Sequence, residues 1–208
     1  MPLLLIRHGE TPLNVARVLQ PAATPLSATG QAQAEALARW LQAHGTLRPT
    51  AIVSSDLPRA LLTAQAIAAA CGLPVLTSPL LHERNFGDLR GQSYDSLGFD
   101  PLASDQAPPG GESRAEFDAR CAAAWDWVLA QRAALDGPLA IVSHGLVIKH
   151  WLNAGPLLWS AGLAAPERLA NTSLSVIDAA PPFTVRQVDS TAHLVGGVGE
   201  DAGSLSGG

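Results

Sequence analysis

The sequence predicts an α/β fold built on a largely parallel sheet. Short apolar runs alternate with longer segments rich in alanine and leucine, as in chains that fold strand, helix, strand. Three runs are apolar at consecutive positions, which is typical of strands buried on both faces of a parallel sheet. These runs are Leu3 to Ile6, Ala51 to Val53 and Leu139 to Val142.

Three weaker strand candidates follow the same logic. They are Val75 to Thr77, Leu174 to Ile177 and Thr184 to Val188. We expect the last two at an edge of the sheet.

Two predicted helices have clear starts. Gln31 to Gln42 carries an apolar stripe at helical spacing, with Ser27 ahead of it and Gly45 closing it. Ser113 is expected to cap a second helix that runs to about residue 134.

The helix predicted from Leu57 to Ala70 has a proline in its first turn, Pro58, and Gly72 just past its end. Asp56 stands where an N-cap residue would stand, and we expect it to fill that role. The following stretch, from about Leu81 to Gly111, has little periodicity and many Gly, Pro and Asp residues. We interpret it as an insertion with one short helix near Tyr94 to Leu97, of the kind that forms functional loops.

Composition limits the classes of protein. With 208 residues, 47% of them hydrophobic, the chain can build one well-buried core, and we expect a single domain over residues 1–195. Residues 196–208 are small and polar and are expected to form a flexible tail. The net charge of −5 argues against a nucleic-acid or membrane surface, so any anion site must be local.

The cellular setting also follows from composition. No apolar run approaches the ~20 residues that span a bilayer. The two cysteines, Cys71 and Cys121, lie in Ala-rich segments without metal-ligand spacing, which indicates free thiols in a reducing compartment. We expect a cytoplasmic protein that acts on a small molecule, and a homodimer is compatible with the sequence.

Unusual polar residues follow the three buried runs. The first run leads into Arg7 and His8, the second into Ser54 to Arg59, and the third into His144 and Gly145. If these strands are parallel, all three sets meet at the carboxyl edge, where open α/β sheets bind ligands. A cation in the first turn of a helix is disfavoured by the helix dipole, so Arg59 indicates a nearby anion. The alternatives are an Arg59 that reaches solvent or pairs with Asp56.

The same residues carry a resemblance to a known family. Arg7-His8-Gly9-Glu10-Thr11 resembles the signature of the histidine phosphatase superfamily, which includes phosphoglycerate mutases and α-ribazole phosphatases. The likeness extends over roughly residues 3 to 178, in the family's order. Its further blocks are Asn14 with Arg17, Pro25-Leu26-Ser27 with Gly30, Ser54 to Ala60 with Thr63-Ala64, Glu83 with Phe86-Gly87-Asp88 and Gly91, Gly110 to Ser113, Ser143-His144-Gly145, and Asn171-Thr172-Ser173.

This resemblance implies a fold and an activity. The fold would be a three-layer α/β sandwich, with a mostly parallel central sheet and helices on both faces, as in phosphoglycerate mutases. The activity would be hydrolysis of a small phosphomonoester without metal or cofactor, nearest in kind to α-ribazole and broad-specificity phosphatases. In that reading, His8 takes the phosphoryl group and Glu83 serves as general acid and base.

The resemblance also implies how the phosphoryl group is bound. Arg7, Arg59 and His144 would stabilise its charge during transfer. Asn14, Gln20 and Gly145 would be further phosphate contacts. Gln20 departs from the family pattern, because many relatives carry Gln-Gly and then an Asp before Pro-Leu, whereas the segment Gln20 to Thr24 keeps only the glutamine.

Three alternatives remain open at this point. A metal site of His8, His144 and Glu83 would resemble non-haem iron centres, but two nearby arginines would repel a divalent cation. A phosphoglycerate mutase would need extra cations for its substrate, and between Glu83 and Ser113 the sequence offers only Arg84 and Arg90. A non-catalytic module that binds phosphorylated ligands would need the arginines but neither His8 nor Glu83.

Overall fold

The structure is a computed structural model that describes residues 1–155 and 157–195. Within them the strands form one sheet in the order β3-β2-β4-β1-β6-β7-β5. β3, β2, β4 and β1 are parallel, β6 is antiparallel to both β1 and β7, and β5 is parallel to β7. The strands are β1 (Pro2–Arg7), β2 (Ala51–Ser54), β3 (Val75–Thr77), β4 (Leu139–Ser143), β5 (Leu157–Trp159), β6 (Leu174–Asp178) and β7 (Phe183–Ser190).

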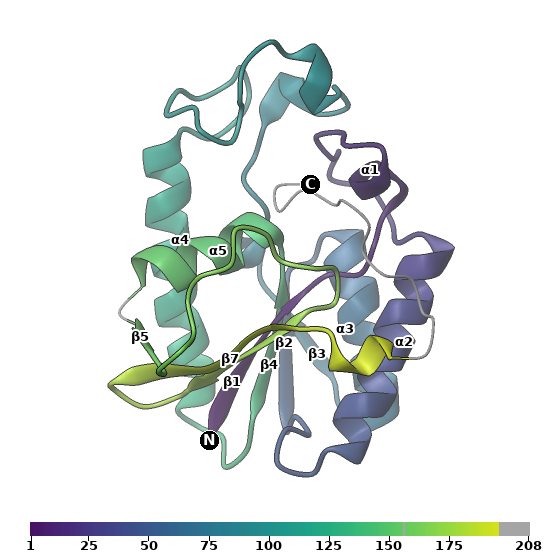
Figure 1. Cartoon of the computed structure of the whole chain (residues 1–208), viewed down its shortest axis with the longest axis vertical. Coiled ribbons are helices and arrows are strands. Elements are labelled where there is room, and N and C mark those ends of the chain that lie inside the picture. The colour runs from purple at the N-terminus through teal and green to yellow at the C-terminus, as the bar shows by residue number, and fades with distance from the viewer. Residues whose placement is uncertain (156, 196–208) are drawn as a thin grey trace.

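Helices cover both faces of this sheet, so the predicted three-layer α/β architecture is confirmed (Figure 1). Leu4 and Ile6 of β1 pack in one core cluster with helices α2 (Ala28–Ala43) and α3 (Pro58–Cys71). Leu3 and Leu5 point the other way, into a cluster with α4 (Arg114–Arg132) and α5 (Gly145–Ala154). Successive side chains of a strand point to opposite faces, which is why a doubly covered strand is apolar throughout.

The predicted start of α4 is confirmed, and α2 starts earlier than predicted. The Ser27 hydroxyl accepts a hydrogen bond from Gly30 N–H, although α2 begins at Ala28, three residues before the predicted start. Ser113 and Glu116 form a reciprocal capping box at the start of α4.

The expected cap of α3 is wrong. The N-cap position is Leu57, which has no side-chain cap, and Pro58 is the first helical residue. The Asp56 carboxylate instead contacts His82 Nε2 at 2.6 Å. At the other end, Gly72 adopts the left-handed conformation (φ 73°) that ends helices readily, as predicted.

The expected sheet edge is also wrong. β6 and β7 both lie inside the sheet, and the edge strands are β3 and β5. β5 is only three residues long and follows α5 closely, so its apolar run was not separable from the preceding helix by periodicity. β5 pairs with the outer side of β7, and β6 pairs with β1 on one side and with β7 on the other.

The insertion arches over the carboxyl edge of the sheet (Figure 1). It holds short 3₁₀ helices at Gly87–Leu89 and Tyr94–Ser96, the second where a short helix was predicted. Its middle is tied to the segment after α1 (Pro12–Val15) by a bridge between Ser93 and Val18 and by three backbone hydrogen bonds. These run from Leu19 N to Gln92 O, from Gly91 N to Leu19 O and from Tyr94 N to Arg17 O.

Three further expectations concern the whole chain. Both cysteines, Cys71 and Cys121, are free and buried, as predicted. Among the described residues, no helix is both long and apolar enough to cross a membrane. The tail predicted at residues 196–208 lies outside the described part.

Candidate active site

The three polar sequences after the buried strands do meet at one edge of the sheet. β1 and β4 pair in parallel with Arg7 opposite Ser143, and β4 pairs with β2 with Val142 opposite Ser54. The residues that follow these strands therefore emerge side by side. This juxtaposition is the one predicted from the sequence.

His8 occupies the centre of this edge and is fully buried. Its Nδ1 lies 2.7 Å from the carbonyl oxygen of Gly9. Because a carbonyl oxygen can only accept a hydrogen bond, Nδ1 must carry the proton. In the neutral ring, Nε2 then bears the lone pair, which makes it the basic nitrogen of the ring.

The backbone around His8 is held from two directions. His8 N–H donates to Ser143 O at 3.0 Å. The His8 carbonyl accepts from Thr172 N at 3.2 Å and from Asn171 Nδ2 at 3.0 Å. Thr172 adopts a left-handed conformation (φ 56°) that is unusual for a residue with a branched side chain. This turn before β6 therefore fixes the position of the imidazole.

Two glycines allow the loop after β1 to pack against α2. A Cβ atom on Gly9 would lie 2.5 Å from Gly30 O, and one on Gly30 would lie 2.0 Å from Glu10 O. Both contacts are with backbone, which cannot move aside cheaply. Only glycine fits at these two positions, and the close packing brings the start of α2 against the His8 loop.

Two arginines flank His8, and both are almost completely buried. Arg7 Nη1 donates to the carbonyl of Leu169. Arg59 makes a single long hydrogen bond, 3.5 Å from Nη1 to Pro21 O, within the described part of the chain. Burial lowers the pKa of Arg59 to about 10, with Glu83 opposing the shift and Arg90 and Arg7 adding to it. Neither the solvent-exposed Arg59 nor its pairing with Asp56 is observed.

His144 lies next to His8. Its ring centroid lies 5.2 Å from that of His8, and its Nε2 lies 2.9 Å from the Ser55 hydroxyl. Burial, and then the charge of Arg59, hold the pKa of His144 well below its usual range. His144 is therefore neutral near pH 7, and its buried Nδ1 has no hydrogen-bond partner among the described residues.

Asn14 and Gln20 belong to a polar network next to His8, because Asn171 Nδ2 contacts both His8 O at 3.0 Å and Asn14 Oδ1 at 3.4 Å. Asn14 Oδ1 accepts from Thr11 N–H at 3.0 Å, and Gln20 Oε1 lies 2.9 Å from the Thr11 hydroxyl. Both side chains are buried, and neither amide nitrogen has a hydrogen-bond partner among the described residues. An unsatisfied buried donor is unfavourable, so both amides are suited to an oxygen-rich ligand.

Glu83 comes from the start of the insertion and is 5% exposed. Its Oε1 accepts from Arg84 N at 2.9 Å, and its Oε2 accepts from Leu146 N in the first turn of α5 at 3.1 Å. Burial raises the pKa of Glu83, despite these hydrogen bonds and the nearby Arg59. A carboxyl with a raised pKa can hold a proton for transfer.

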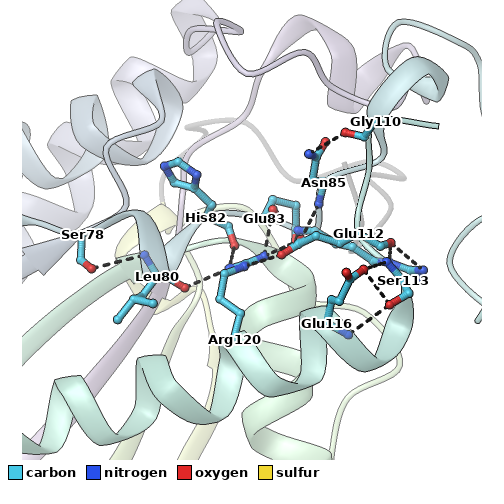
Figure 2. A network of polar contacts seen from close by, with 11 residues as sticks. Ser78, Leu80, His82, Glu83, Asn85, Gly110, Glu112, Ser113, Glu116 and Arg120 are labelled. Carbon is cyan, nitrogen blue, oxygen red and sulfur yellow. Dashed lines mark hydrogen bonds and ion pairs between the residues drawn. The ribbon is translucent and has the colours of Figure 1, made fainter. Parts of the chain in front are cut away.

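The segment that carries Glu83 is clamped by Arg120 of α4 (Figure 2). Arg120 Nη1 donates to the carbonyls of Leu80 (2.9 Å) and His82 (2.7 Å), and Nη2 donates to the carbonyl of Glu83 (3.3 Å). Glu112 holds the same guanidinium from the far end of the insertion. Arg120 was not predicted as a site residue, because nothing in its local sequence pattern distinguishes it from a solvated helical arginine.

Tyr94 and Arg90 of the insertion were also missed. Burial and the charge of Glu83 raise the pKa of the Tyr94 hydroxyl, on which Arg7 acts in the opposite sense. Arg90 is among the charges that lower the pKa of Arg59. Tyr94 and Arg90 therefore lie near enough to the site for their charges to interact with those of Glu83, Arg7 and Arg59, which depends on how the insertion folds back.

The metal alternative has a direct geometric test. Within the described ranges, no three His, Cys, Asp or Glu side chains are grouped so that they could hold a metal ion. His8, His144 and Glu83 therefore do not form the ligand set that a non-haem iron site requires.

With this geometry in place, comparison with known proteins identifies the class. The chain belongs to the histidine phosphatase superfamily (branch 1), whose pattern it matches over residues 3–182. It is 36% identical, over 93% of this chain and 95% of the relative, to a protein of Yersinia enterocolitica named as a probable phosphoglycerate mutase.

Two solved structures share the fold over nearly their whole length. One is the α-ribazole phosphatase of Shigella flexneri, with a TM-score of 0.74, 29% identity, and coverage of 92% of this chain and 98% of that chain. The other is a mycobacterial glucosyl-3-phosphoglycerate phosphatase, with a TM-score of 0.72, 28% identity, and coverage of 91% and 98%. The phosphoglycerate mutase-like fold expected from the sequence is thereby confirmed.

Proposed function

We propose that this protein hydrolyses a small phosphomonoester through a phosphohistidine at His8, without a metal ion. The observation that carries the proposal is the tautomer of His8, whose Nδ1 proton is engaged by Gly9 O and whose Nε2 is thereby the basic nitrogen. Arg7, Arg59 and the neutral His144 surround the His8 ring. A nucleophile surrounded by phosphate-binding groups is what phosphoryl transfer requires.

In the first step, His8 Nε2 attacks phosphorus as the bond from phosphorus to the ester oxygen breaks. Arg7 and Arg59 bind the non-bridging oxygens, whose charge they stabilise without a metal. The Asn14 and Gln20 amides add neutral donors, as does the N-terminus of α5 at Gly145. Glu83, whose pKa is raised by burial, gives its proton to the departing oxygen.

In the second step, water attacks the phosphorus of phospho-His8. The Glu83 carboxylate left by the first step takes a proton from this water, and the bond from nitrogen to phosphorus breaks. Inorganic phosphate leaves, and both His8 and Glu83 return to their initial states. Glu83 thus donates a proton in the first step and accepts one in the second. Its burial, which raises its pKa, favours both roles.

The matched test uses p-nitrophenyl phosphate in the presence of a chelator. We expect His8→Ala to abolish phosphate release and His44→Ala, at the exposed end of α2, to leave it unchanged. An acid-labile, alkali-stable phosphoenzyme should form only in proteins that retain His8. Full turnover by a folded His8→Ala protein would refute the covalent step, and loss of wild-type activity on metal removal would refute the metal-independent one.

A second candidate is a phosphoglycerate mutase, which the name of the Yersinia relative suggests. Hydrolysis is preferred because the insertion, which would have to cover the substrate of a mutase, supplies only Arg84 and Arg90 as cations. Incubation with 3-phosphoglycerate separates the two reactions. Release of phosphate supports the hydrolase, and formation of 2-phosphoglycerate without phosphate release supports the mutase.

A further inference from the structure

A cavity of about 310 Å³ lies between α4, α5 and the insertion, and none of the groups proposed to bind phosphate lines it. Its size is that of a small-molecule site. Four cationisable side chains line it, namely Arg84, Arg114, Lys149 and His150. None of the described residues that line it is acidic. Lys149 is the only lysine of the sequence.

Arg84 is the most unusual of these residues, because its charge is 3% exposed and no described carboxylate pairs with it. Nη2 donates to Ser104 O at 2.8 Å, and Nε lies 3.4 Å from Glu112 O. Nη1 makes no hydrogen bond with a described residue. Burial and the neighbouring Arg114 lower the pKa of Arg84, and the charges of Glu112, Asp118 and Asp105 oppose this shift. None of these carboxylates is within ion-pair distance of Arg84. A buried charge without a direct ion pair is unfavourable, so the site favours an anion.

The other cations are only partly neutralised. Lys149 Nζ donates to a carbonyl, Glu167 O, at 2.9 Å. Arg114 pairs with Asp118 at 2.8 Å, and the same carboxylate lies 3.0 Å from His150 Nδ1. One carboxylate therefore serves two of the four groups, and the positive charge of Arg84 and Lys149 has no acidic partner among the described residues.

The cavity adjoins the carboxyl group proposed as the general acid. The two backbone donors to Glu83 belong to Arg84 and Leu146, and both of these residues line the cavity. A leaving oxygen must come within hydrogen-bond distance of Glu83 to receive its proton. A leaving group held there would lie beside Arg84 and Leu146, which both donate to Glu83 and line the cavity.

We propose that this cavity receives the leaving group of the substrate, and that this group carries a carboxylate on an apolar body. The carboxylate would bind Arg84 and Lys149, with Arg114 at the rim. The side chains of Leu102, Phe117 and Leu146 offer apolar walls for the body. The proposal rests on the proposed phosphatase activity and names the substrate class of that site.

The test compares two esters of nearly equal shape, 4-carboxyphenyl phosphate and 4-carbamoylphenyl phosphate. We expect the wild-type protein to prefer the carboxylate by about tenfold or more in kcat/KM, the size of one charge-assisted hydrogen bond. Lys149→Gln and Arg114→Gln should reduce this preference. Arg39→Gln is the matched control, because Arg39 is also an exposed helical arginine paired with a carboxylate four positions away, and it should keep the preference.

A second measurement does not need turnover. In the His8→Ala protein, the carboxylate ester should slow acetylation of Lys149 several-fold, as followed by peptide mass spectrometry, and the carboxamide ester should not. Hydrolysis of both esters at equal efficiency, together with unprotected Lys149, would overturn this inference and leave the phosphatase proposal intact. Absence of hydrolysis with Lys149 still protected would instead count against the proposed activity and for the cavity.

Discussion

Arg120 and Glu112 form a two-point ion pair beside Glu83, with Nε to Oε1 at 2.7 Å and Nη2 to Oε2 at 2.8 Å (Figure 2). Both side chains are less than a quarter exposed. The pair joins α4 to both ends of the insertion, because Glu112 Oε2 also accepts from Asn85 N at 2.8 Å. The position of Glu83 therefore depends on a contact between segments that are distant in the sequence.

Glu112→Gln should loosen this clamp. We expect a loss of about 1–3 kcal/mol of stability, because the Arg120 guanidinium loses its charged partner. We also expect slower hydrolysis of alkyl phosphates, which need proton donation by a well-placed Glu83. Urea unfolding and hydrolysis of glycerol phosphate check the two effects. The control is Glu116→Gln at the exposed capping box, and an equal kinetic loss there would contradict the clamp.

Glu83→Gln separates good from poor leaving groups. Hydrolysis of glycerol phosphate should slow by about 10²-fold more than that of p-nitrophenyl phosphate, since general-acid catalysis contributes roughly that much. The variant should also accumulate phosphoenzyme from the activated ester, because the base for the second step is gone. Equal slowing of both esters with no trapped phosphoenzyme would show that the acid lies elsewhere.

Glu83→Gln should slow hydrolysis but should increase the stability of the folded protein at high pH. Burial raises the folded-state pKa of Glu83 above its unfolded value. As the pH rises from the unfolded pKa to the folded pKa, the unfolded chain has released this proton and the folded protein still holds it, so the folded protein loses stability. Glu83→Gln should therefore raise the melting temperature at pH 8 more than at pH 4. Melting curves at the two pH values decide the matter, and a variant less stable at pH 8 would contradict it.

Arg59→Met should change stability and anion binding in opposite directions. Removal of a buried guanidinium with one long hydrogen bond should stabilise the free protein. Inorganic phosphate or vanadate, which stabilises the wild type by mass action, should no longer do so. Thermal shifts with and without vanadate measure both quantities. Arg17→Gln, at an exposed ion pair with Asp95, should keep the wild-type response, and an Arg59→Met protein that also kept it would exclude Arg59 from the anion site.

His193 should contribute to acid sensitivity. Its Nε2 lies 2.9 Å from the Thr172 hydroxyl, and burial lowers its pKa to about 4. Between pH 6.5 and about 4 the unfolded chain binds a proton at this residue and the folded protein does not, so stability falls as the pH falls. His144 acts in the same direction. Urea unfolding at pH 7.5, 5.5 and 4.5 should show a smaller decline for His193→Gln, and an unchanged decline would argue against this role.

Much of the candidate site could be predicted from the sequence, because it depends on a rule that acts locally. Consecutive apolar residues marked β1, β2 and β4, and parallel strands present their carboxyl ends at one edge. His8, Arg59 and His144 were therefore expected together before any contact was known. The strand that became the edge, β5, was missed because three residues after a helix carry too little periodicity.

By itself, then, the sequence determined the α/β class, the strand ends and the residues that follow them, since periodicity and strand direction are properties of short segments. Only the tertiary structure decided what surrounds them. It buried Glu83 and clamped its segment with Arg120, brought Tyr94 over from the insertion, and placed Lys149 of α5 in one cavity with Arg84. These contacts join segments tens of residues apart, and they arise from the packing of two helical layers and an insertion on one sheet, which no local pattern encodes.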